Sequence, residues 1–178
     1  MTGPIVAGLV AALGWFVGYF LTKRREEKNR RLEARMRRTE RQIEELYGPL
    51  FNLMRAVFTV YGVRQQALSR SAGIPPADEL AFRRFVQADF FMPLHQRMRD
   101  ILTRKLHLIE DGKIPDSFID YMEHSTQQFV QASAPEALNT IAGRIDVRPW
   151  PRAFEVDVKG MLNIFMQRYE QCARSLYR

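Results

Sequence analysis

The chain of 178 residues has one cysteine and three histidines, which restricts the chemistry open to it. Because Cys172 is alone, no disulfide can form within the chain, as is usual for proteins of a reducing cytoplasm. His95, His107 and His124 stand far apart, and the sequence contains no zinc-binding, nucleophile-elbow or phosphate-cradling motif. We expect His95 and His107 to be surface or capping residues. We therefore predict no catalytic residue, no metal site and no cofactor, and a protein that is not an enzyme.

Charged side chains are absent from residues 1–22 and then appear at once in Lys23, Arg24 and Arg25. As a helix, residues 4–22 are about 28 Å long, which matches a hydrocarbon core of about 30 Å. A cleaved signal peptide carries its positive charge before the apolar run, so a retained transmembrane helix is favoured. The positive flank predicts a bacterial inner-membrane protein with Met1 outside and the remainder in the cytoplasm. We expect five residues to lie at the membrane interface: Trp15, Tyr19, Lys23, Arg24 and Arg25.

Glycine and proline are absent between Thr22 and Tyr47, and charged residues are dense there, which predicts a juxtamembrane helix over residues 23–47. Residues 23–41 include ten Lys or Arg and four Glu, so this segment carries +6 of the total net charge of +7. Basic residues beside a membrane attract anionic lipid headgroups. We expect lipid and not nucleic acid as the partner, because no aromatic residue on which bases could stack occurs between Thr22 and Leu46.

Small and apolar residues recur in a single heptad register through both predicted helices. Small residues let helices approach closely in lipid, and apolar residues at this spacing form the seam of a coiled coil. The pattern predicts a homo-oligomer built on one continuous helical rod. Its predicted oligomerisation seam comprises Ala7, Ala11, Gly14, Gly18, Leu32, Met36 and Ile43.

The rest of the chain, residues 48–178, is predicted to be an all-helical cytoplasmic domain. Gly48 and Pro49 are expected to break or kink the rod and to act as a hinge, because proline removes a backbone donor. Apolar residues at helical spacing continue to the C-terminus, and no long alternating β pattern occurs. The predicted fold class is all-α: a transmembrane helix (1–22), continuous with the basic helix (23–47), followed by a helical bundle (48–178).

The layout resembles the small membrane-anchored accessory proteins of type VI-B CRISPR loci, which accompany an RNA-guided RNase. The similarity covers the charge-free N-terminus, the charged helix, the segment from Glu45 to Leu50 and the helical body. It implies a degenerate HEPN-like fold and an oligomeric membrane pore that strengthens antiviral defence. The Arg…His pair of HEPN RNases is missing, because neither Arg nor Asn stands five to seven positions before any histidine. No nuclease residue therefore follows from the resemblance.

Two functions are open at this point. The first is a homo-oligomeric membrane protein that forms a pore or perturbs the membrane, as an accessory effector in antiviral defence. The second is a membrane-tethered helical scaffold that recruits a cytoplasmic protein partner and has no pore activity.

Overall fold

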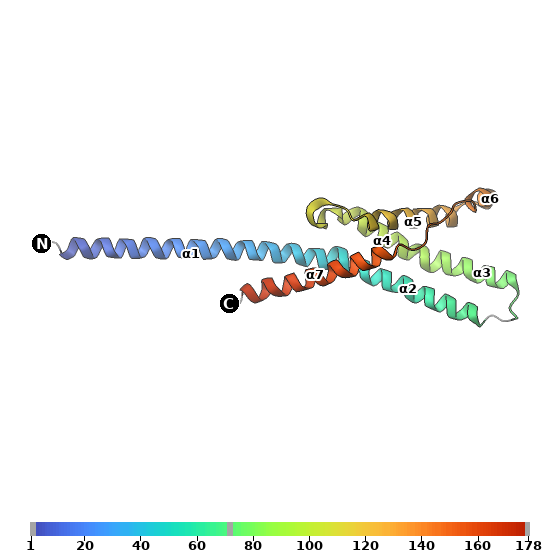
Figure 1. The fold of residues 1–178 in the computed structure, drawn as a ribbon, viewed down its shortest axis with the longest axis horizontal. Coiled ribbons are helices and arrows are strands. Elements are labelled where there is room, and N and C mark those ends of the chain that lie inside the picture. Colours follow the sequence, from blue (N-terminus) through green and yellow to red (C-terminus); the bar gives the residue numbers. More distant parts are fainter. Residues whose placement is uncertain (1–2, 71–72, 177–178) are drawn as a thin grey trace. The chain divides into compact units, whose positions relative to one another are not determined.

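The protein is all-helical, as predicted, throughout the part of the chain that is described (Figure 1). The computed structural model describes residues 3–70 and 73–176, with backbone only at positions 3–12, 111, 136 and 139. The long helices are α1 (Gly3–Gln42), α2 (Gly48–Ser69), α3 (Pro76–Val86), α4 (Met92–Lys105), α5 (Asp116–Ser133) and α7 (Arg152–Leu176). The short ones are the π-helical turns η1 (Ile43–Tyr47) and η2 (Gln87–Phe91), the 3₁₀ turns η3 (Leu106–Leu108), η4 (Glu110–Gly112) and η5 (Glu136–Leu138), and α6 (Asn139–Ala142).

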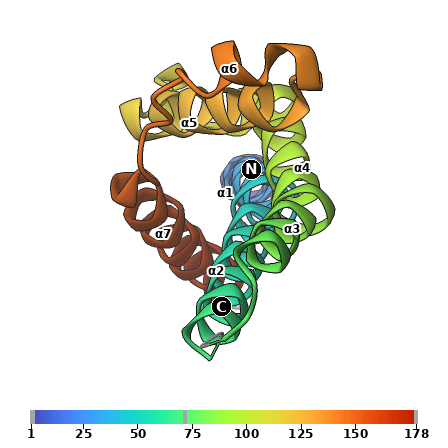
Figure 2. The same ribbon diagram turned by 90° about the vertical axis from the view of Figure 1, so that its right-hand side faces the viewer.

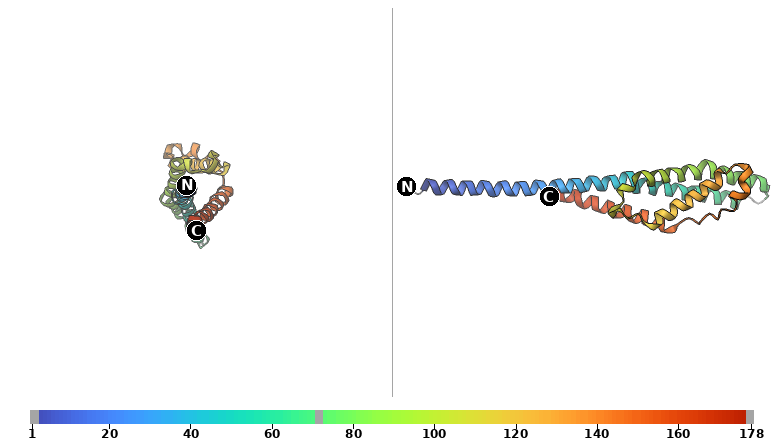
Figure 3. Two further views of the ribbon diagram at one scale, coloured as in Figure 1. Left: turned by 90° about the vertical axis from the view of Figure 1, so that its left-hand side faces the viewer. Right: turned by 90° about the horizontal axis from the view of Figure 1, so that it is seen from above.

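The chain divides into two compact units. The first contains the chain up to Glu40 together with the segment from Gln167 onward, and the second runs from Arg41 to Met166. Within the first unit, α1 is one unbroken helix that passes from the charge-free sequence into the basic sequence (Figure 3). The continuity predicted across the Leu21–Lys23 boundary is therefore confirmed.

The predicted transmembrane segment lies only partly in the described region. Residues 1–2 and the side chains of residues 3–12, including those of Ala7 and Ala11, are outside it. Among the described residues, none of the helices has the length and apolar character needed to span a membrane.

The predicted end of the helix at Gly48 and Pro49 was wrong, while the kink and the hinge expected there stay predictions. The backbone of Gly48 is right-handed helical, with φ of −65° and ψ of −52°, and α2 begins directly after η1. The Gly48 N–H donates to the carbonyl of Ile43, five residues earlier. A proline ring normally collides with the carbonyl four residues before it, and the wider π-helical turn relieves this clash without breaking the helix.

The same arrangement occurs a second time, before Pro93. The η2 turn precedes α4, and the Met92 N–H donates to the carbonyl of Gln87. Both prolines lie at the start of α2 or α4, directly after the widened turn. The chain thus accommodates both internal prolines in the same way, by a π-helical turn that widens the helix just before each of them.

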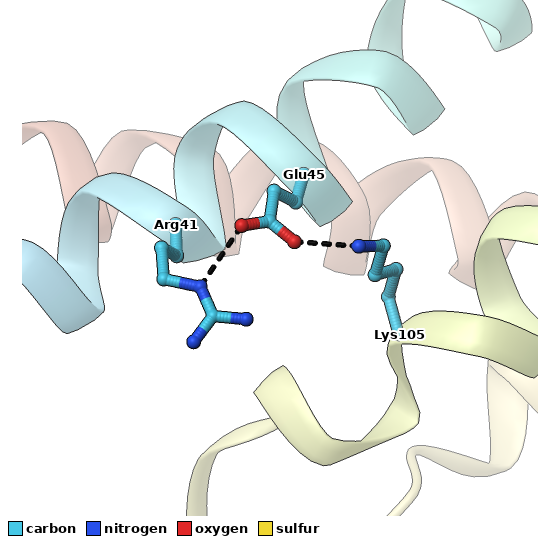
Figure 4. Close-up of polar contacts among 3 residues, drawn as sticks. All are labelled: Arg41, Glu45 and Lys105. Carbon is cyan, nitrogen blue, oxygen red and sulfur yellow. Dashed lines mark hydrogen bonds and ion pairs between the residues drawn. The ribbon is translucent and has the colours of Figure 1, made fainter.

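Polar contacts hold the start of the second unit onto the end of α4 and the turn after it. The side chain of Gln42 is buried, and its Nε2 donates to the carbonyl of Leu108 at 2.7 Å. Glu45 accepts from Arg41 Nε at 2.9 Å and from Lys105 Nζ at 2.6 Å (Figure 4). Hydrogen bonds from Arg41 and then Lys105 lower the pKa of Glu45 to about 2.

The core of the second unit is formed by side chains from α2, α4, α5 and the first half of α7, and Figure 2 shows these helices arranged around it. Tyr47 packs on Phe165 with ring centroids 5.2 Å apart. Tyr121 stacks on Phe154 at 4.4 Å. Burying such aromatic rings is the main stabilising term available to this bundle. The largest fully buried side chains are those of Tyr47, Tyr121, Phe118, Phe154, Phe165, Leu46, Leu50, Met54, Met98 and Leu102.

Candidate functional site

The second unit contains a cavity of about 880 Å³, within the size range of small-molecule sites. The walls come from α2, η2, α4, α5, the linker before α7 and the first turn of α7. The residues that line the cavity are Val57, Phe58, Tyr61, Arg64, Gln87, Phe91, His95, His124, Gln128, Val147, Arg148, Pro149, Trp150, Arg152, Glu155 and Val156.

Helical spacing explains how each element presents its side chains to the cavity. On α2, positions 57, 61 and 64 follow a spacing of four and three residues, which places them on one face. On α5, His124 and Gln128 are four residues apart and therefore also share a face. Trp150 stands between Pro149 and Pro151 in the linker, where two fixed φ angles restrict the backbone.

A chain of hydrogen bonds crosses one wall of the cavity. Gln87 Nε2 donates to Gln128 Oε1 at 3.1 Å, and Gln128 Nε2 contacts His124 Nε2 at 3.3 Å. His124 Nδ1 lies 2.5 Å from the carbonyl oxygen of Arg148. Because a carbonyl oxygen can only accept, Nδ1 of His124 carries the proton and its Nε2 accepts from Gln128. Burial lowers the pKa of His124, which favours this neutral form.

His95 lies within the aromatic cluster behind this wall, and the expectation that it is a surface or capping residue was wrong. Its side chain is 3% exposed, and Nδ1 lies 2.9 Å from the hydroxyl of Tyr121. Burial, and then the nearby His124, lower the pKa of His95 to about 4. At neutral pH both rings are therefore uncharged. His107, by contrast, is exposed, as expected.

Two nitrogen donors at this cavity are left without a partner. Arg64 Nε and Trp150 Nε1 are buried and make no hydrogen bond. The guanidinium of Arg64 lies over the rings of Tyr61 and Phe91, 5.2 Å from each centroid. Trp150 contacts Phe58 edge-on at 5.3 Å and Tyr121 at 5.5 Å. The aromatic contacts hold both donors in place, and a buried donor without an acceptor costs about 1–3 kcal/mol.

The described lining offers several groups that could hold a ligand. It provides N–H donors, aromatic faces, the carboxylate of Glu155 and the guanidinium groups of Arg64, Arg148 and Arg152. Within the described residues, His, Cys, Asp and Glu side chains form no group that could hold a metal ion.

The residues predicted for the oligomerisation seam lie along α1 and the turn that follows it. A Cβ added at Gly14 or Gly18 meets no atom within 4 Å. Leu32 and Met36 are half-buried. Ile43 packs against the core of the second unit, so part of its surface is already covered within one chain.

The residues predicted for the membrane interface are exposed within the protomer. Trp15 and Tyr19 stack on each other one helical turn apart, with centroids separated by 5.9 Å. Lys23, Arg24 and Arg25 are exposed on the next turn of the same helix.

The cavity and its two unpartnered donors were not predicted from the sequence, although the spacing of apolar residues around His95 indicates that this side chain is buried. Phe91, His95, Met98 and Leu102 follow the spacing of a buried helix face, and all four are buried. That spacing indicates that His95 faces the core. The sequence around Arg64 contains no such signal, because Phe91, one of the two rings it contacts, lies far away in the sequence.

Comparison with family models, curated proteins and solved structures finds no match to this chain in any of the three.

Proposed function

We propose that the chain is a homo-oligomeric membrane protein, anchored by the first part of α1, with the second unit on the cytoplasmic side. The observation that carries this proposal is the apolar surface of residues 13–21. Its large side chains are between 49% and 71% exposed, and the two positions between them without a large side chain, Gly14 and Gly18, carry no polar group either. A helix that is apolar all round needs apolar surroundings, and lipid supplies them.

The charge-free sequence on either side of this surface supports the same conclusion. No Asp, Glu, Lys, Arg or His occurs before Lys23, and the described helical backbone begins at Gly3. At the boundary, Thr22 Oγ1 donates to the carbonyl of Gly18 at 2.9 Å, so its hydroxyl is satisfied inside the helix. Such internal hydrogen bonding is what a polar group at the edge of lipid requires. The basic residues that follow then face anionic headgroups in the cytoplasmic leaflet.

Self-association is supported by the open space over the glycines of α1. Since a Cβ at Gly14 or Gly18 would meet none of the other described residues within 4 Å, the backbone of a second helix can approach here. In lipid this close approach provides the van der Waals contact that drives helix association. The resemblance to CRISPR accessory proteins extends the proposal to a pore or membrane-perturbing assembly that acts in antiviral defence.

Two paired substitutions test the seam. Gly14→Leu with Gly18→Leu fills the proposed contact face and should abolish assembly in detergent and the loss of membrane potential in cells. Phe16→Leu with Phe20→Leu, on the opposite face of the same turns, keeps the helix apolar and should leave both unchanged. Persistence of assembly and depolarisation in the glycine variant contradicts the proposal.

Replacing residues 2–21 with an unrelated single span distinguishes the tethered-scaffold hypothesis from the pore hypothesis. A protein that acts through its seam loses activity after the replacement. A scaffold that recruits a cytoplasmic partner keeps its activity, because any span serves as an anchor.

A further inference from the structure

We infer that the cavity between α2, α4, α5 and the linker is a binding site for a small organic anion with a flat apolar body. This site lies outside the proposed seam and does not depend on it.

The position of the unsatisfied donors carries the inference. Across the described residues, only two buried side-chain nitrogen or oxygen atoms lack a hydrogen-bond partner, and both line this cavity. Both Arg64 Nε and Trp150 Nε1 are donors, so the missing groups are acceptors. Their concentration in one cavity is what a site awaiting an acceptor-bearing ligand shows, because native structures leave few such groups unpaired.

The charge around the cavity favours an anion over a neutral acceptor. Arg64 makes no ion pair within the described part of the chain, whereas Arg148 is held by Asp120 and Glu123. Arg152 adds a second cation at the lining, and Glu155 adds one carboxylate. A hydrogen bond from a guanidinium to an anionic group is about twice as strong as one between neutral groups.

The side chains that line the cavity indicate the nature of the uncharged part of the ligand. The rings of Phe58, Tyr61, Phe91 and Trp150 line the cavity, and aliphatic side chains from α2, the linker and α7 complete it. An inorganic anion alone would leave most of the 880 Å³ unfilled. A flat aromatic body can stack on these rings while its anionic group reaches Arg64 and Trp150.

Two pairs of probes test the inference, each consisting of an anion and its uncharged analogue. Indole-3-acetate with indole-3-acetamide represents carboxylates, and adenosine monophosphate with adenosine represents phosphates. Binding is measured by calorimetric titration of the full chain in a non-ionic detergent, with protein-free micelles as the blank. We expect one anion to bind at least tenfold more tightly than its uncharged analogue, and the pair that shows the preference identifies the anionic group.

Substitutions assign the preference to the cavity. Arg64→Gln should remove the preference for the anion. Trp150→Phe keeps an aromatic ring but loses the N–H, so it should weaken the binding of the anion several-fold. Arg55→Gln makes the same charge change at an exposed position on the same helix and should bind like the original protein. If Arg64→Gln does not fold, Arg64→Lys retains the cation and should keep the preference with weaker affinity.

Three results would overturn the inference: neither anion binds, each anion binds no better than its uncharged analogue, or Arg64→Gln keeps the preference. None of these results concerns assembly, so failure of this inference and failure of the membrane proposal can be told apart.

Discussion

Single residues in the second unit hold conformations and protonation states that depend on their burial. His95 is the clearest example, because its ring is enclosed by Tyr121, His124 and Trp150 with centroids 5.7–6.0 Å away. Its pKa of about 4 lies well below the ordinary value of 6.5. The unfolded chain therefore takes up a proton at a pH where the folded protein does not.

This difference predicts that the protein loses stability as the pH falls from about 6.5 towards 4. At neutral pH the His95 ring is uncharged in both the folded and the unfolded state, so its titration does not change the stability. Between about pH 6.5 and 4, each further pH unit lowers the free energy of unfolding by up to about 1.4 kcal/mol. His124 adds to the loss in the same direction, since its pKa is also lowered. The unfolding midpoint of the full chain, measured between pH 7.5 and 4.5, should fall less steeply in His95→Phe. An unchanged slope in that variant contradicts the assignment.

Gly48 lies tightly against the π-helical turn that precedes it. A Cβ at this position would lie 2.6 Å from the carbonyl oxygen of Ile43, which belongs to the backbone of that turn. Gly48→Ala should therefore destabilise the protein by about 1–3 kcal/mol, because the backbone must shift.

The matched control is Gly62→Ala on the same helix, where a Cβ meets nothing within 4 Å. This change should stabilise the protein by about 0.5–1 kcal/mol, the usual gain of alanine over glycine in a helix. Chemical denaturation of both variants measures the difference. Equal effects of the two substitutions would show that the turn does not need glycine.

At the scale of elements, the packing of α5 on α7 includes a polar contact near the start of both helices. Ser117 is buried, and its Oγ donates to Asp157 Oδ2 at 2.5 Å. Hydrogen bonds to a charged group contribute more than those between neutral groups. This contact therefore helps to fix how α7 approaches α5.

Ser117→Ala should lower the free energy of unfolding by about 1–2 kcal/mol, because Asp157 loses its donor but remains half-hydrated. Ser175→Ala serves as a control, since that exposed hydroxyl bonds only to a carbonyl of its own helix. Denaturant titration should separate the two variants. If Ser117→Ala loses no more stability than Ser175→Ala, the hydrogen bond between Ser117 and Asp157 does not stabilise the fold.

The helices themselves were largely predictable, whereas the two π-helical turns were not. Apolar spacing and the absence of glycine and proline between Thr22 and Tyr47 were enough to predict the long first helix. Pro49 and Pro93 signal strain in a helix, but a proline in sequence permits either a kink or a widened turn. The choice between them depends on packing, here on Leu46, Tyr47 and Phe91, which the turns direct into the core.

At the scale of the whole molecule, the cavity was beyond sequence reasoning because its walls are joined only by tertiary contacts. Arg64, His95 and Trp150 belong to three segments separated by about thirty residues or more. The apolar run that ends at Lys23 was predictable because charge and length are local properties. The proposed anchor therefore rests on local sequence properties, whereas the proposed ligand site rests on tertiary contacts.

The central claim is that protomers associate through α1, and the mass of the intact complex in detergent tests it most directly. One protomer has a mass of 20.8 kDa. Native mass spectrometry of the full chain should give a whole-number multiple of this value greater than one, reduced to a single protomer by Gly14→Leu with Gly18→Leu. An unmodified protein that is a 20.8 kDa monomer contradicts the account.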